Sequence, residues 1–467
     1  MRDRPFFELS QSVGRRPLSV LACLALVLVC QSPVASGASQ SERPNVLLII
    51  SDDQAWTDFG FMGHPAIETP ELDALAEESM VFPRGYVPTA LCRASLATII
   101  TGLYAHEHQL TGNDPPRGVD RALMLEHIAA VDTLPGLLGE VGYKSLQTGK
   151  WWEGDCRCGD FTEGMTHGDP KRGGRHGDLG LKIGRDTMAP AFDFIDACSE
   201  AGDPFFLWYA PFLPHRPHNP PERLLEKYRG EGVSDSIARY YAMCEWFDET
   251  CGQLLDHLDE KKLADDTIVL YVTDNGWIQR ADNGRYAPRS KRSQYDGGLR
   301  TPIMVRWPGK VKPEDRPELA NSIDLAPTIL KACGLAPTKA MQGIDLRQPA
   351  HTRTAKEREV YSEEDHEGNI LWSIRTERMK LIGANEGNPR GLPTRELFEI
   401  DIDPKEEYPL DPGANSGETG TLEQHADLHR RAAEGEAVAD SGEADMSFEE
   451  CEQLRMLGYV EDCSHLQ

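Results

Sequence analysis

Short apolar runs alternate along the chain with segments of helical periodicity, and no other feature limits the fold so narrowly. The runs Asn45–Ser51, 204–210 and Thr267–Thr273 are almost continuously apolar, as is typical of strands buried on both faces of a sheet. The segment 236–261 carries apolar residues near helical spacing. Strands that alternate with helices predict an α/β fold, in which a large, mixed but mostly parallel sheet lies between helices.

Other stretches of the first 345 residues extend this pattern. Thr69 and Pro70 carry the cap and first-turn signals of a helix. Further strands are expected at 143–148 and 302–307, and further helices at 133–141, 186–201 and 322–333. The alternation therefore accounts for one large α/β domain.

Beyond about Asp345 the pattern changes to short candidate strands, which suggests a small antiparallel sheet. These strands are expected at 359–362, 370–375, 379–382 and 397–400. The segment 411–446 is rich in Gly, Ala and Glu and is predicted to form a loop, followed by a short helix at 448–457. We therefore divide the mature chain into an α/β domain (38–345) and a smaller C-terminal α+β domain (346–467).

Residues 1–37 have the features of a secretory signal peptide. Arg15 and Arg16 precede the apolar run 18–30, and small residues at 35–38 offer a cleavage site. The run is too short to span a membrane comfortably, so no stable membrane insertion is expected after cleavage. The sequence thus predicts export to the periplasm or the extracellular space.

The cysteines and the net charge bear on disulfides, metal binding and nucleic-acid binding. Eight cysteines besides Cys92 follow the signal peptide, and after export they permit disulfides without requiring them. Cys156 and Cys158 lack a second pair of metal ligands, so a zinc site is not expected. A formal net charge of −27 argues against nucleic-acid binding, because Lys and Arg are not in excess to neutralise phosphates.

Acidic and amide side chains directly follow two of the predicted strands. Asp52 and Asp53 end the first, and Asp274 and Asn275 end another, with Gly276 allowing a tight turn. Ligand sites in open α/β sheets form outside the carboxyl ends of strands. Each Asp alone is better explained as a turn residue or a helix cap. Together these oxygens suit one hard divalent cation, calcium or magnesium.

Cys92 precedes a mostly apolar, helix-compatible run, where backbone N–H groups favour negative charge. A lone cysteine at such a place is more often a small buried hydrophobic residue. Lys150, His215 and Lys291 follow strands or lie near the same predicted edge. They could stabilise an oxyanion and protonate a leaving group, although each alone also fits a surface charge or a structural hydrogen bond.

In chain order, these residues fall in blocks that resemble the type I, formylglycine-dependent sulfatases of the alkaline-phosphatase-like superfamily. The resemblance runs from Arg43 to Pro404. The matching blocks are Ser51-Asp52-Asp53, residues 92–102, Gly149-Lys150-Trp151, Pro214-His215, Thr273-Asp274-Asn275-Gly276, and Lys291 with the segment 296–302. The resemblance implies an alkaline-phosphatase-like fold with residues 38–345 as the catalytic domain.

The resemblance also implies a mechanism. A formylglycine-generating or anaerobic maturation enzyme would convert Cys92 to formylglycine, whose hydrated aldehyde attacks sulfur. Lys150, His215 and Lys291 would bind the sulfate and assist departure of the alcohol. The residues that would hold the cation, usually calcium, are Asp52, Asp53, Asp274 and Asn275. The substrate would be a sulfated small molecule or, for an exported enzyme, more typically a sulfated carbohydrate.

Two positions depart from the pattern of that family. Leu96 stands where the maturation motif usually has arginine, and Trp152 stands where a histidine usually follows the Lys-Trp pair. Arg93 and the basic residues of 171–176 are candidates to compensate. Two alternatives to a sulfatase remain. The same metal and oxyanion geometry could serve a phosphomonoester or phosphodiester hydrolase of the same superfamily. Leu96 and Trp152 motivate the other alternative, a catalytically inactive binder of sulfated glycans.

Overall fold

The computed structural model describes residues 43–114, 121–168, 179–348 and 358–431. The predicted signal peptide, the basic run 171–176 and the predicted helix 448–457 lie outside these residues.

The central sheet has the strand order β4 (Glu163–Gly164), β3 (Lys144–Gly149), β5 (Phe205–Ala210), β1 (Asn45–Ser51), β6 (Thr267–Thr273), β7 (Arg300–Arg306), β2 (Met80–Tyr86) and β8 (Glu314–Asp315). Strand β9 (Ala320–Asn321) also pairs with β2.

Strand direction decides which chain segments meet at each edge of this sheet. β1 pairs in parallel with both β5 and β6, and β3 pairs in parallel with β5. β7 runs antiparallel to both β6 and β2, so β2 runs in the same direction as β1. The carboxyl ends of β1, β2, β3, β5 and β6 therefore share one edge with the amino end of β7. The predicted mixed, mostly parallel sheet is confirmed.

Strand β2 was not predicted from the sequence. Pro83 and Gly85 interrupt its apolar pattern, and its register against β7 shifts between Phe82 and Gly85. A Cβ atom on Gly85 would lie 2.4 Å from the backbone oxygen of Thr301, so glycine permits the close approach of the two strands. Cross-strand pairing, which a sequence pattern does not reveal, thus makes this segment a strand.

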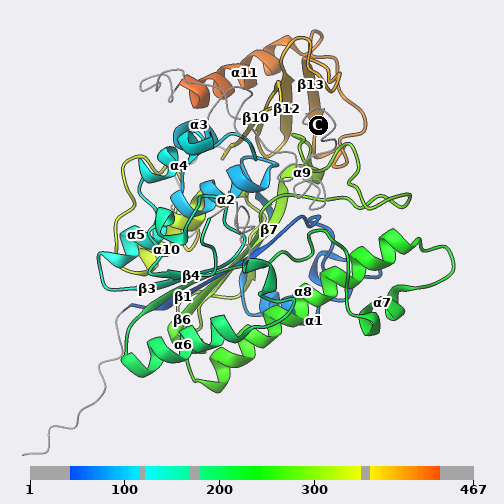
Figure 1. The fold of residues 1–467 in the computed structure, drawn as a ribbon. Helices are drawn as coiled ribbons and strands as arrows, with labels where there is room; N and C mark the ends of the chain where they lie inside the picture. The colour runs from blue at the N-terminus through cyan, green and yellow to red at the C-terminus, as the bar shows by residue number, and fades with distance from the viewer. Residues whose placement is uncertain (1–42, 115–120, 169–178, 349–357, 432–467) are drawn as a thin grey trace, which may run out of the picture. The chain divides into compact units, whose positions relative to one another are not determined.

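Helices cover both faces of the sheet (Figure 1). One face packs against α2 (Cys92–Thr101), α5 (Leu134–Gly139) and α10 (Leu325–Ala332), and the other against α1 (Pro70–Glu77), α6 (Ala189–Ala201) and α8 (Asp235–Glu260). In β1, Val46, Leu48 and Ile50 join the first core, whereas Leu47 and Ile49 join the second. Burial on both faces explains why the strand is apolar without alternation.

The shorter helical segments connect these layers. They are η1 (Gly60–Met62), α3 (Ala105–His108), α4 (Arg121–Ala129), η2 (Cys156–Gly159), η4 (Gly180–Lys182), α7 (Glu222–Tyr228), η5 (Ala264–Asp266), α9 (Asp296–Leu299) and η6 (Ser322–Asp324). Thr69 precedes α1 as predicted, but its hydroxyl donates to Asp73 Oδ1 (2.9 Å) rather than capping the helix, and accepts from the Gly60 N–H (2.8 Å).

The predicted antiparallel C-terminal sheet is also confirmed. Its order is β10 (Val360–His366), β11 (Asn369–Arg375), β12 (Met379–Ala384) and β13 (Arg395–Glu399). The loop predicted from residue 411 is wrong in part, because helix α11 occupies Ser416–Arg431. Leu422 and Ala426, one helical turn apart, pack into a core with Trp372 and Leu381. Burial of this face stabilises a helix that its composition does not favour.

Every cysteine in the described part of the chain is a free thiol. Cys244 and Cys251 lie on the same helix, α8, and both are buried in core clusters. None of the helices in the described ranges combines the length and apolar character needed to cross a membrane.

Candidate active site

The predicted site residues meet at the sheet edge where the carboxyl ends of the parallel strands lie. Each predicted side chain is at most 5% exposed. Those that follow strands β1, β2, β3, β5 and β6 are Asp52, Asp53, Cys92, Lys150, His215, Asp274 and Asn275. Lys291 lies ahead of the antiparallel strand β7 and reaches the same edge. Strand direction alone thus explains why residues up to 239 positions apart converge.

Backbone and side-chain hydrogen bonds join the ends of β1 and β6. The Asp53 N–H donates to Asp274 Oδ1 (3.0 Å), and Asn275 Nδ2 donates to Asp53 Oδ1 (2.7 Å). Asp53 has a left-handed backbone (φ 59°), which is uncommon for a residue other than glycine. Such strain is found where the surrounding structure fixes a functional side chain.

Several oxygens in this cluster have the chemistry of ligands for a hard cation. Asp52 Oδ2, Asp53 Oδ2 and Asn275 Oδ1 are buried and have no hydrogen-bond partner among the described residues. One potential ligand atom from each of Asp52, Cys92 and Asp274 lies within 4.8 Å of the others. Burial and the neighbouring Asp274 raise the pKa of Asp52 well above its ordinary value, against the opposing effect of Lys150. A divalent cation fits this donor set, because it would compensate the buried negative charge.

Two lysines connect the acidic cluster to the cysteine. Lys150 Nζ donates to Asp52 Oδ1 (2.6 Å) and to Asp274 Oδ2 (3.3 Å). Lys291 Nζ donates to Asp53 Oδ1 (2.6 Å) and to Cys92 Sγ (2.9 Å). Burial raises the pKa of the Cys92 thiol, although both lysines oppose the change. An unmodified thiol here is therefore held in its protonated, weakly nucleophilic form.

His215 faces the same carboxylates from the loop after β5. Its Nε2 lies 3.4 Å from Asp53 Oδ2, and its Nδ1 lies 2.6 Å from the carbonyl oxygen of Arg216. The contact with a carbonyl assigns a proton to Nδ1 and turns Nε2 toward the site. Burial lowers the pKa of His215, while Asp53 opposes and the two lysines reinforce this effect.

Arg185, which was not identified from the sequence, holds the loop after β5 in place. Its guanidinium donates to the carbonyl oxygens of Phe212 (2.6 Å), His215 (2.8 Å) and Pro217 (3.3 Å). Burial lowers the pKa of Arg185 to about 10. The residue lies in no motif, so only the folded structure reveals its connection to His215.

Comparison with known proteins assigns the family. A family model described as Sulfatase matches residues 44–335, which is more than half of the chain, and one described as N-sulphoglucosamine sulphohydrolase, C-terminal, matches residues 284–418. The chain belongs to the sulfatase family. Members of this family are sulfuric ester hydrolases, and this sulfatase is therefore an enzyme of that class.

Named relatives agree with this assignment. The sulfatase is 29% identical over 380 residues to N-acetylgalactosamine-6-sulfatase of Canis lupus familiaris, covering 71% of this chain and 70% of the relative. It is 25% identical over 485 residues to arylsulfatase A of Homo sapiens, covering 88% and 91%. The solved structure of Ps i-CgsB in complex with k-i-k-neocarrahexaose shares the fold, with a TM-score of 0.71, 22% identity and coverage of 89% of this chain and 97% of that chain.

Both departures from the family pattern are buried in the sulfatase. Leu96 and Trp152 belong to the apolar core on the α2 face of the sheet. Arg93, considered above as a compensating cation, forms a buried ion pair with Glu153, with Nε–Oε1 and Nη2–Oε2 distances of 2.6 and 2.5 Å. Its charge is thus already matched by a carboxylate, and the pair joins α2 to the segment after Lys150.

The aromatic side chains of Trp277 and Tyr240 lie beside the site, and Trp277 is next to Lys291. The Trp277 ring centroid lies 5.8 Å from Lys291 Nζ and 5.9 Å from Arg216 Cζ. His218, which also follows β5, contacts the rings of Tyr240 and Trp277, at centroid distances of 5.4 and 6.2 Å. His218 therefore packs against these aromatic rings, and it was not among the site residues predicted from the sequence.

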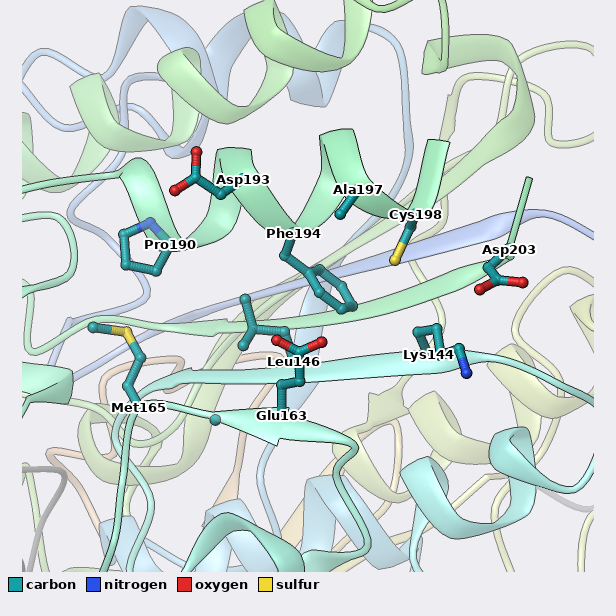
Figure 2. A pocket seen from close by; sticks show the side chains of 11 residues that line it. Lys144, Leu146, Glu163, Met165, Pro190, Asp193, Phe194, Ala197, Cys198 and Asp203 are labelled. Atoms are coloured by element: carbon teal, nitrogen blue, oxygen red, sulfur yellow. The ribbon is translucent and has the colours of Figure 1, made fainter. Parts of the chain in front are cut away.

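A separate pocket of about 480 Å³ lies between α6 and the β3–β4 edge (Figure 2). Its lining includes Lys144, the first residue of β3, and Asp203, just before β5, so it reaches the amino ends of strands whose carboxyl ends form the candidate site. Glu163, Asp193 and Asp203 contribute three carboxylates against the one ammonium of Lys144. This charge balance disfavours a sulfate ester.

Proposed function

We propose that this sulfatase hydrolyses sulfate esters of carbohydrates with a nucleophile made from Cys92. The observation that carries the proposal is the convergence of Cys92, Lys150, His215 and Lys291 on one buried acidic cluster. A relative named N-acetylgalactosamine-6-sulfatase and a neighbour solved with a neocarrahexaose support a carbohydrate rather than a simple aryl ester.

One divalent cation, calcium or magnesium, is part of the proposal. The residues that would hold it are Asp52, Asp53, Asp274 and Asn275, whose orphaned oxygens fit such a group. When bound, the cation polarises a sulfate oxygen and stabilises negative charge at the nucleophile.

The chain's own residues then have defined tasks. Conversion of Cys92 to formylglycine by a maturation enzyme would supply a hydroxyl nucleophile, a route that an unmodified thiol cannot follow. Lys291, 2.9 Å from Cys92 Sγ, favours negative charge at this side chain, and the first turn of α2 adds its positive dipole end. Lys150 contributes positive charge from the opposite side of the cluster.

His215 is the group that we assign to the leaving alcohol. Its Nδ1 is committed to the Arg216 carbonyl, so Nε2 is the nitrogen that can hold a proton on the site side. Protonation of the ester oxygen as the S–O bond breaks would let the alcohol leave neutral.

We further propose that the protein is exported to the periplasm or the extracellular space and matured by a formylglycine-generating or anaerobic enzyme. The Arg15-Arg16 pair and the apolar run 18–30 support export. A sulfated carbohydrate outside the cytoplasm would then be accessible to the enzyme.

Product analysis tests the proposed function. Protein coexpressed with a maturation enzyme is assayed for sulfate release, by ion chromatography, from monosaccharide and disaccharide sulfates and from 4-nitrophenyl sulfate. The same preparation is assayed with 4-nitrophenyl phosphate, and a Cys92→Ala variant is the control. We expect sulfate release from carbohydrates that Cys92→Ala lacks. Preference for the phosphate ester, or equal rates in the variant, would overturn the proposal.

A further inference from the structure

A second group of buried polar side chains lies beside the candidate active site, on strand β10 of the C-terminal sheet. The Glu363 N–H and the Ser362 hydroxyl donate to carbonyl oxygens of the segment 87–90, at 2.8 and 3.4 Å. The backbone N–H of Arg292 donates to a carbonyl of the same segment (3.0 Å). Since this segment leads directly into Cys92, both β10 and Arg292 lie next to the nucleophile's helix.

The other end of β10 packs against the segment that follows α3. A Cβ atom on Gly112 would lie 2.5 Å from His366 Nδ1, so the imidazole packs directly on this glycine. The next residue, Asn113, accepts the Arg93 N–H at its Oδ1 (3.1 Å) in the first turn of α2. Residues 112 and 113 therefore connect the end of β10 to the first turn of α2.

Three side chains in this region have polar atoms without a hydrogen-bond partner among the described residues. They are Glu364 at both carboxylate oxygens, Thr89 at its hydroxyl and Arg292 at Nε. Glu364 is 1% exposed and Thr89 is fully buried. Arg292 Nε lies 3.9 Å from Glu364 Oε1, which is beyond hydrogen-bond reach. Buried donors and acceptors without partners are rare, and either water or the hydroxyl groups of a bound ligand can satisfy them.

The backbone of Arg292 supports a role in binding. Its φ of 62° is left-handed, an uncommon conformation for a residue other than glycine. Arg292 follows Lys291 directly, and its side chain is 19% exposed, so it can be reached from solvent. In this conformation the two consecutive side chains have different neighbours: Lys291 contacts Cys92, and Arg292 faces Glu364.

We propose that Glu364, Arg292 and Thr89 form a subsite that binds hydroxyl groups of the sugar ring carrying the sulfate ester. The inference rests on the proposed function and names where the carbohydrate is held. The Glu364 carboxylate accepts hydrogen bonds from hydroxyls, whereas Arg292 Nε and the Thr89 hydroxyl donate to hydroxyl oxygens. A neutral ring fits better than a second sulfate, because a buried carboxylate repels an anion.

A matched pair of isosteric variants tests the subsite. Glu364→Gln removes the charge of a carboxylate that has no hydrogen-bond partner among the described residues. Glu367→Gln changes an exposed carboxylate that pairs with the same Arg292, at 2.7 Å. The readouts are kcat and KM on N-acetylgalactosamine 6-sulfate and other monosaccharide sulfates, kcat/KM on 4-nitrophenyl sulfate, and the thermal unfolding midpoint.

We expect Glu364→Gln to lower kcat/KM on the carbohydrate about tenfold more than on 4-nitrophenyl sulfate, mainly through KM, because one charge-assisted hydrogen bond is lost. Glu367→Gln should change the ratio of the two substrates by less than about twofold. Equal losses on both substrates, or equal effects of the two variants, would mean that Glu364 serves only as a counter-ion, and would overturn the subsite.

Binding of unsulfated N-acetylgalactosamine, followed by ligand-observed NMR, separates this inference from the proposed function. The measurement needs no turnover and no conversion of Cys92. Weaker binding to Glu364→Gln than to Glu367→Gln supports the subsite even if no sulfate is released. Equal binding, or none to the wild type, contradicts it even if the enzyme is an active sulfatase.

Discussion

Removing Arg93 should destabilise the protein strongly, because it leaves a charged carboxylate buried. The Arg93 and Glu153 side chains are 2% and 3% exposed, and they make parallel hydrogen bonds of 2.6 and 2.5 Å. Loss of one partner from such a pair costs about 3–5 kcal/mol. Arg93→Met should therefore lower the free energy of unfolding by that amount. With a urea m-value of about 3 kcal/mol/M, the midpoint would fall by roughly 1–1.7 M.

A double-mutant cycle and an exposed control make this prediction specific. The variants are Arg93→Met, Glu153→Gln and the double variant, measured by tryptophan fluorescence in urea. The double variant should be more stable than the sum of the single effects predicts, by about 2 kcal/mol or more. The pair Arg223–Glu249 is also bidentate, through Nη1 and Nη2, but its side chains are 60% and 32% exposed, so Arg223→Met should cost about 0–1 kcal/mol. Similar costs for Arg93→Met and Arg223→Met, or strictly additive effects within the cycle, would show that the buried ion pair does not contribute the predicted stability.

Three further predictions concern activity, acid stability and the cation. Arg185→Lys should lower kcat about tenfold and shift the pH profile of kcat, because lysine cannot make the several hydrogen bonds that the guanidinium makes to the His215 loop. A change confined to the unfolding temperature would count against a role of Arg185 in positioning His215. Burial lowers the pKa of His429 from 6.5 to about 4, so stability that is present above pH 6.5 is lost as the pH falls toward 4. His429→Phe keeps a ring stacked on Tyr361, where the two ring centroids of the wild type lie 4.9 Å apart. The variant should reduce the dependence of the melting temperature on pH between these values. An unchanged pH dependence would exclude His429 as the cause of the acid destabilisation. Treatment with EDTA should reduce both sulfate release and the unfolding temperature, and calcium or magnesium should restore both. An unfolding temperature that EDTA does not change would contradict binding of a cation in the acidic cluster.

The sequence was most informative where a local pattern and the sheet geometry agree. β1 and β6 are buried on both faces and therefore have unbroken apolar runs, which predicted their positions. Because parallel strands end at a common edge, the polar residues after these two runs could be expected to meet, and the structure brings Asp53 and Asp274 into hydrogen-bond contact.

Other features depend on contacts that no local pattern records. Strand β2 is fixed by pairing with β7 despite Pro83 and Gly85, and α11 is fixed by the burial of Leu422 and Ala426. Arg185 acts on a loop about 30 residues away through carbonyl oxygens, which have no sequence signature. Long-range pairing and side-chain to backbone bonds were therefore the main source of the missed features.

The mass of the tryptic peptide that contains Cys92 tests directly whether this residue supplies the nucleophile, when it is measured on the same preparation whose sulfate release is assayed. We expect the cysteine CH₂SH group to be replaced by an aldehyde, and the rate of sulfate release to rise in proportion to the converted fraction. An unmodified Cys92 thiol in protein that releases sulfate at full rate would contradict this role of Cys92, as would complete conversion with no hydrolysis of any sulfate ester.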